Sequence, residues 1–174
     1  MSKCRPEDTD GEDSPPGQCA GRIEAAQWSI DVRESLNCIF VKWGRAPALE
    51  DSRAYFEALQ QLPAFHAGAR MFNDLRALDP DLPTTFFRQA ARLGPSTPTP
   101  AAGQKLALLV ASDVAFGLMR IFATFRQRPG LEVGVFGDLE EAKAWLDLPA
   151  GIGDPFADMA GGRGPRGLRP SEKR

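Results

Sequence analysis

The sequence has few of the residues on which metal-centred and nucleophilic chemistry depend. Its 174 residues include one histidine, His66, and three cysteines, Cys4, Cys19 and Cys38. No two cysteines form a C-x-x-C pair, and one histidine cannot complete a zinc-ligand set or fill every role of a Ser-His-Asp or Cys-His-Asn site. A structural metal, a disulfide framework and a catalytic triad are therefore not expected. We expect Cys38, which lies in an apolar run, to be buried and inert.

Long apolar runs and an excess of one charge are also missing. No run approaches the ~20 apolar residues of a membrane span, and the N-terminus has no apolar region of the secretory type. The 21 Lys and Arg residues nearly balance the 23 Asp and Glu residues, which leaves a net charge of −2. A general nucleic-acid binder would need a clear excess of positive charge. These features predict a cytoplasmic protein without a transmembrane segment, a cofactor or a specific nucleic-acid partner.

The near-neutral total hides two tails of opposite charge. Residues 1–21 carry five acids and two bases and lack Leu, Ile, Val and Phe, so they cannot bury enough apolar surface to offset the entropy of ordering. Residues 161–174 carry five bases and one acid. We predict a disordered acidic segment at 1–21, one folded domain at 22–150 and a flexible basic tail at 151–174. The tail either contacts nucleic acid, an acidic partner or the acidic head of its own chain, or it is solvated without a partner.

The middle of the chain alternates strand and helix patterns. Apolar residues repeat every second position over residues 27–34, which predicts a half-buried strand, and residues 38–43 follow as the second strand of a hairpin. Three further strands are predicted at 69–75, 105–111 and 131–136. Helical spacing of apolar residues predicts four helices. The first lies between Pro47 and Pro63, the second runs from Pro83 to Gly94, the third begins at Ser112 or Asp113 and carries apolar residues as far as Phe125, and the fourth runs from Asp138 to Pro149. The order ββαβαβαβα predicts a single α/β domain with a mixed, mostly parallel five-stranded sheet and about four helices.

Four segments of this domain resemble the STAS-like family of small bacterial proteins, which is related in fold to anti-sigma factor antagonists and CRAL-TRIO lipid carriers. They are I-F-V-K-W-G-R (39–45), F-N-D-L-R (72–76), D-V-A-F-G-L-M-R-I-F (113–122) and V-F-G-D-L-E-E-A-K-A-W-L (135–146). The resemblance covers roughly residues 27–148 and implies one STAS-like sheet with helices packed on it. In the antagonists an Asp at the end of the third strand precedes a phosphorylated Ser or Thr. Here Asp74 precedes Leu75 and Arg76, so the resemblance does not extend to a phosphorylation switch.

The candidate site lies where the parallel strands end, because ligands of such sheets bind there. Asp74 and Arg76 are candidates for anchoring a partner or polar ligand; alternatively Asp74 caps its loop and Arg76 pairs with an acid such as Asp79. Ser112 or Asp113 caps the helix that follows, so Asp113 is either part of the site or an N-cap. Five further residues of the same helix are also candidates.

Phe116, Met119 and Phe122 either line an apolar ligand pocket around Gly117 or belong to the ordinary core, and Arg120 either faces a partner or is solvated. Gly117 costs the helix stability, so we expect it to permit a close approach of backbone or ligand.

These observations favour a non-catalytic module that binds a protein partner or forms a homodimer, since no paired carboxylates or nucleophile–base pair are visible. The expected working surface is the loop at 74–76 with the adjoining start of the third helix. The alternative is a carrier of a small apolar ligand of the CRAL-TRIO type, which requires an enclosed cavity of roughly 300 Å³ or more.

Overall fold

The computed structural model describes residues 21–93, 103–127 and 129–159, which form an α/β domain around one six-stranded sheet. The strands are β1 (Arg22–Glu24), β2 (Trp28–Arg33), β3 (Cys38–Trp43), β4 (Arg70–Asp74), β5 (Gln104–Leu109) and β6 (Leu131–Phe136). The helices are α1 (Leu49–Gln60), α2 (Pro63–His66), α3 (Thr84–Leu93), α4 (Asp113–Arg126) and α5 (Leu139–Trp145). Short 3-10 turns occupy Glu34–Leu36 and Ala150–Ile152.

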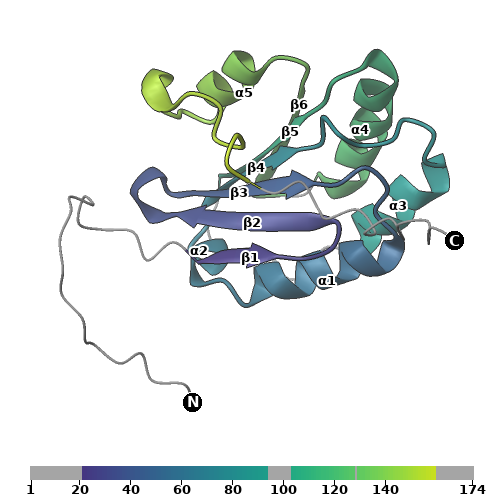
Figure 1. Ribbon diagram of the computed structural model, residues 1–174, viewed down its shortest axis with the longest axis horizontal. Coiled ribbons are helices and arrows are strands. Elements are labelled where there is room, and N and C mark those ends of the chain that lie inside the picture. The colour runs from purple at the N-terminus through teal and green to yellow at the C-terminus, as the bar shows by residue number, and fades with distance from the viewer. Residues whose placement is uncertain (1–20, 94–102, 128, 160–174) are drawn as a thin grey trace, which may run out of the picture.

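The strands lie in the sheet in their order along the chain. The pairs β1–β2 and β2–β3 are antiparallel, and β3, β4, β5 and β6 are parallel to one another. Right-handed crossovers between successive parallel strands place their helices on the same face of the sheet. Accordingly α1, α3 and α4 cover one face, and α5, which follows the last strand, covers the other (Figure 1).

Two elements were missed by the sequence prediction of five strands and about four helices. The strand β1 has three residues and a single apolar side chain, Ile23, which is too short to show a period. The helix α2 is a single turn that begins at Pro63, where we expected the preceding helix to end. Proline is well accepted at a first helical position, so the same residue both closes α1 and opens α2.

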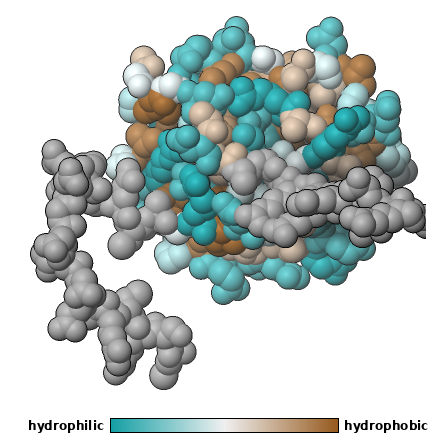
Figure 2. Space-filling view, viewed as in Figure 1, coloured by the Kyte–Doolittle hydropathy of each residue, from teal (hydrophilic) through white to brown (hydrophobic). Residues whose placement is uncertain are grey.

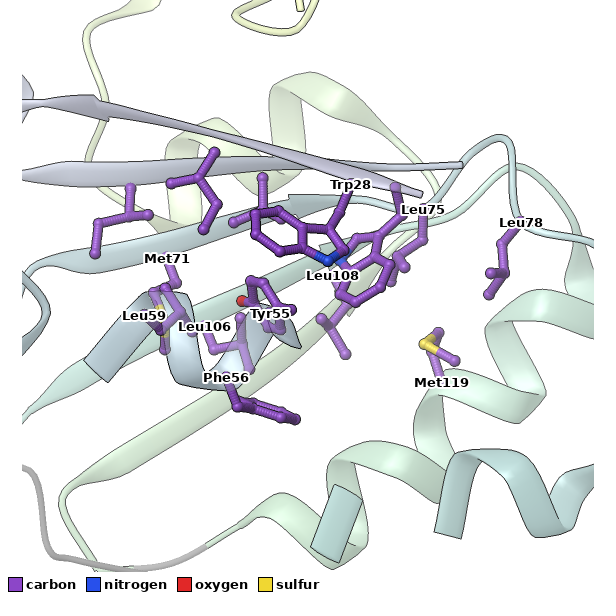
Figure 3. Close-up of a cluster of buried hydrophobic side chains, with 14 of the residues drawn as sticks. Trp28, Tyr55, Phe56, Leu59, Met71, Leu75, Leu78, Leu106, Leu108 and Met119 are labelled. Carbon is purple, nitrogen blue, oxygen red and sulfur yellow. The ribbon is translucent and has the colours of Figure 1, made fainter. Parts of the chain in front are cut away.

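Alternation along the strands builds a separate core on each face. On the face of α1, α3 and α4, every second residue of β2 and β3 meets Tyr55, Phe56 and Leu59 of α1. Figure 3 shows Trp28 of β2 beside Tyr55, and the indole Nε1 of Trp28 donates to the carbonyl of Asp51 at 3.0 Å. On the other face, Phe40 and Phe72 are fully buried beneath α5.

The strand β2 is more enclosed than its alternating pattern predicts. Its polar residues Ser29 and Asp31 are buried as well as its apolar ones. Arginines cover Asp31, because Arg33 Nε donates to Asp31 Oδ2 at 3.0 Å and Arg22 Nη2 lies 3.9 Å from the same carboxylate oxygen. The expected solvent-facing side of β2 is therefore a buried, paired surface.

Candidate functional site

The carboxyl ends of β3, β4 and β5 meet at one edge of the sheet, where the sequence predicted a site. The loop after β3 begins at Gly44, and a Cβ there would lie only 2.6 Å from the Gln27 side-chain oxygen of the β1–β2 turn. The loops after β4 and β5 contribute Asp74 with Arg76, and Ser112 with Asp113. The structure thus brings the predicted loops to a common edge, but it gives their side chains different roles.

Asp74 is buried and pairs with Arg76. Its carboxylate accepts the Arg76 backbone N–H at 3.0 Å and two guanidinium N–H groups at 2.9 Å each. The hydrogen bond that the Arg76 guanidinium donates to Asp74 is the largest of the effects that raise the pKa of Arg76 above its ordinary value. Asp74 therefore caps its loop, as one of the two interpretations predicted, and both of its carboxylate oxygens accept hydrogen bonds from Arg76.

Arg76 also reaches a part of the chain that sequence reasoning did not connect to it. Its Nη2 lies 2.9 Å from Asp154 Oδ2. Burial of the Asp154 carboxyl raises its pKa, but the Phe156 N–H and the Arg76 guanidinium outweigh this effect and lower the pKa below its usual value. The alternative that Arg76 pairs with an acid is therefore confirmed, but the acids are Asp74 and Asp154. The suggested example, Asp79, pairs instead with Arg45 at 3.3 Å.

Asp154 belongs to a segment that we name the C-terminal strap (residues 153–159), which packs on the α5 face of the sheet. Phe156 is fully buried there, and its ring centroid lies 4.9 Å from that of Phe72. Basic side chains bind the strap's carbonyls: Arg33 donates to Pro155 at 2.8 Å, and Lys42 to both Phe156 and Met159 at 3.0 Å. Folded contacts thus extend to Met159, which corrects the predicted domain end at residue 150 and the assignment of 151–159 to a flexible tail.

The helix α4 begins with a serine cap rather than an aspartate cap. Ser112 is the N-cap, and its hydroxyl accepts the Ala115 N–H at 3.2 Å. Asp113 is the first helical residue and is exposed, so of the two predicted caps, Ser112 and Asp113, the structure confirms Ser112. A carboxylate in the first turn still interacts favourably with the helix dipole.

The other α4 candidates do not form one pocket. Phe116 is half-buried against the core, while Arg120 and Gly117 are exposed. No described atom lies within 4 Å of a Cβ built on Gly117, so the expected close approach at this glycine is absent from the part of the chain that the structure describes.

A small cavity of about 60 Å³ does open between the sheet and α1, α3 and α4, and Met119 and Phe122 line it. It lies on the inner side of α4, away from the exposed position of Gly117. Its polar wall includes Tyr55, whose hydroxyl donates to Asn73 Oδ1 at 3.5 Å, and burial raises the pKa of Tyr55 to about 12. Ligand pockets usually have volumes of roughly 300 Å³ or more, so this cavity admits only a small group as it stands.

The outer flank of α4 carries apolar residues that the packing leaves partly exposed. Val114, Leu118, Ile121 and Phe125 recur at positions i, i+4, i+7 and i+11, which places them along one side of a helix. We name these four residues the α4 stripe. Val114 is 60% exposed and Phe125 46% exposed, and they are the exposed large apolar residues among those described. The apolar period revealed these residues, but only the packing shows that the buried side is centred on Ala115 and Met119.

The surroundings of the α4 stripe are basic. The adjacent helix α3 carries Arg88 and Arg92, both exposed, and no acid. The Arg88 guanidinium carbon lies 5.9 Å from the ring centroid of Phe125. By contrast, the face of the molecule shown in Figure 2 is mainly hydrophilic, with apolar residues in small scattered groups. The α4 stripe is therefore an apolar surface with an arginine border on the α3 side.

The described residues include neither a cluster of metal ligands nor an ionised cysteine. They contain no group of three His, Cys, Asp or Glu side chains placed to hold a metal ion. Cys38 is buried as predicted, and burial raises its pKa to about 12, which keeps the thiol protonated at neutral pH. None of the described helices has the length and apolar character needed to cross a bilayer.

Comparisons of the chain with protein-family models, with curated protein sequences and with solved structures found no match.

Proposed function

We propose that the chain is a non-catalytic, STAS-like protein-interaction module that binds its partner through the α4 stripe. The observation that carries this proposal is the exposure of Val114 and Phe125, at 60% and 46%, on a domain whose other described large apolar side chains are buried or half-buried. Leu118 and Ile121, between them in the stripe, are half-buried, and Leu118 also packs against the core. A contiguous apolar surface exposed to water is costly, and such surfaces commonly mark protein–protein contacts. The STAS-like part of the proposal rests on the four sequence segments quoted above.

The loop at 74–76, which the sequence favoured as the working surface, has a structural role in this proposal. Asp74 and Arg76 are paired with each other, and Arg76 also holds the strap through Asp154. Substituting both residues would loosen the strap as well as any partner contact. The experiment must therefore use the α4 stripe.

The test compares two double variants of α4 in the full chain. Val114→Glu with Phe125→Glu places two acids in the stripe, and Thr124→Glu with Gln127→Glu adds the same charge at exposed positions outside it. Both variants should keep an unfolding free energy within about 0.5 kcal/mol of the parent, since exposed substitutions rarely cost more. Affinity capture from the producing cells should then lose its specific partner only with the stripe variant. An unchanged set of captured proteins would refute the proposal.

The second candidate function, carriage of a small apolar ligand, is favoured by the cavity beside Met119 and Phe122. Its lining is mainly apolar, with Ser52, Tyr55 and Asn73 as the polar side chains. At about 60 Å³ it is small, so a lipid would enter only if α3 and α4 moved apart. Native mass spectrometry of the purified chain should show a bound small molecule that is lost when Ala90, on the cavity wall, is changed to Phe. Parent protein that carries no ligand would refute this function.

A further inference from the structure

The border of the α4 stripe indicates the chemistry of what binds there. Within α3 and α4 there are four arginines, Arg88, Arg92, Arg120 and Arg126, and one acid, Asp113, although the whole chain has a net charge of −2. Arg126 is buried, with its guanidinium over the Phe56 ring, so the exposed positive charges of these two neighbouring helices are Arg88, Arg92 and Arg120. Arg88 and Arg92 are exposed, and no described acid forms an ion pair with either of them.

The shape of the stripe favours a helix as its occupant. From Val114 to Phe125 the stripe runs along three turns of α4, about 17 Å at 1.5 Å per residue. A helix laid along it satisfies its own backbone hydrogen bonds. An extended strand would set unpaired N–H and C=O groups against apolar side chains, which is unfavourable.

We propose that the α4 stripe binds an amphipathic helix of a partner protein whose apolar face is flanked by acidic residues. This inference rests on the proposed function and adds the chemical class of the partner. The apolar side chains of the partner helix cover Val114, Leu118, Ile121 and Phe125, and its carboxylates lie against Arg88 and Arg92. Charge complementarity of this kind selects partners and fixes their orientation.

Two other occupants fit the observations less well. A second copy of the chain, packed α4 against α4, would place the α3 arginines of both copies around one contact and would oppose like charges. The acidic segment 1–21 has the right charge, but it lacks the Leu, Ile, Val and Phe residues needed to cover the stripe. Both are outcomes that the experiment distinguishes.

The test uses two synthetic 18-residue helical peptides that share leucines at i, i+3, i+4 and i+7. One carries glutamates beside the leucine face, and the other carries lysines at the same positions. Binding to the full chain is followed by fluorescence anisotropy, and its location by amide chemical-shift changes in isotope-labelled protein. The glutamate peptide should bind at least about five-fold more tightly, with shifts in α3 and α4, and rising salt should weaken binding.

A charge reversal with a matched control tests the role of the arginine border. Arg88→Glu should weaken the binding of the glutamate peptide about five-fold and strengthen the binding of the lysine peptide. Arg53→Glu, the same change at an exposed position of α1, should alter neither. The inference would be overturned if the parent chain bound the two peptides equally, or if Arg88→Glu and Arg53→Glu lost the same affinity for the glutamate peptide.

Two further measurements identify the alternatives. Shifts in α4 that depend on protein concentration alone would show self-association, and stronger shifts with phosphatidylserine vesicles than with peptide would show a membrane surface; either overturns the acidic-helix inference. If both peptides bind the stripe equally and Val114→Glu with Phe125→Glu abolishes binding, the acidic-helix inference fails while the proposed function stands. If the stripe variant instead changes neither peptide binding nor partner capture, the proposed function fails as well.

Discussion

Gly117 occupies an exposed position in the middle of α4, where glycine costs a helix about 1 kcal/mol relative to alanine. Because no described atom lies within 4 Å of a Cβ built there, Gly117→Ala should raise the unfolding free energy by about that amount. Urea unfolding followed by circular dichroism measures the change.

Gly134 of β6 is the matched control for this substitution. A Cβ at Gly134 would lie 2.6 Å from a ring carbon of Phe136, so Gly134→Ala should give no gain and should lower stability. Loss of stability on Gly117→Ala would show that a segment does pack against α4 at this glycine, as the sequence first suggested.

At the scale of elements, the C-terminal strap completes the second face of the sheet. Phe156 is fully buried between Phe40 and Phe72, so Phe156→Ala should lower the unfolding free energy by about 3–5 kcal/mol through lost burial and the cavity left behind. Asp158→Ala changes an exposed side chain two residues away and should stay within about 0.5 kcal/mol of the parent. Chemical denaturation of the two variants decides the matter; a loss below 1 kcal/mol for Phe156→Ala would mean that the strap contributes little to the fold.

The whole molecule is joined by ion pairs between distant segments, and these make its stability depend on pH. The pKa of Asp79 is lowered mainly by the hydrogen bond from the Asp81 N–H and, to a smaller extent, by the one from Arg45. The pKa of Asp147 is lowered by the hydrogen bond that Lys105 donates to its carboxylate. Asp154 has a lowered pKa despite its burial. A carboxyl group whose folded pKa lies below its unfolded value of about 3.9 stabilises the fold fully above that value. This contribution is lost as the pH falls through the folded pKa.

Asp154→Asn should therefore be less stable than the parent at pH 7, because the pairing with Arg76 is weakened. The difference should narrow as the pH falls through the folded pKa of the Asp154 carboxyl, because the parent side chain then becomes uncharged, as the asparagine already is. Asp158→Asn, in the same strap, should match the parent throughout. A gap between Asp154→Asn and the parent that stays constant from pH 7 to pH 2 would contradict the assigned role of the carboxylate.

Much of the fold was predictable because local patterns record it. The predicted strand at 131–136 has the observed bounds of β6, and the hairpin of β2 and β3 follows from alternation and a turn. The alternation at β2 could not reveal that Asp31 is buried, because Arg22 and Arg33 cover it from neighbouring positions of the sheet. For the site, the sequence placed Asp74 and Arg76 at the correct edge but could not show Asp154, which is 78 residues away along the chain.

The sequence by itself therefore determined the order of strands and helices, the class of the fold and the apolar period of α4, since each depends on residues a few positions apart. Only the tertiary structure decided which side of α4 is left uncovered and which charges are already paired. Those properties depend on which segments pack together, and for α4 the outcome is a buried side at Ala115 and Met119 and an exposed stripe beside the arginines of α3.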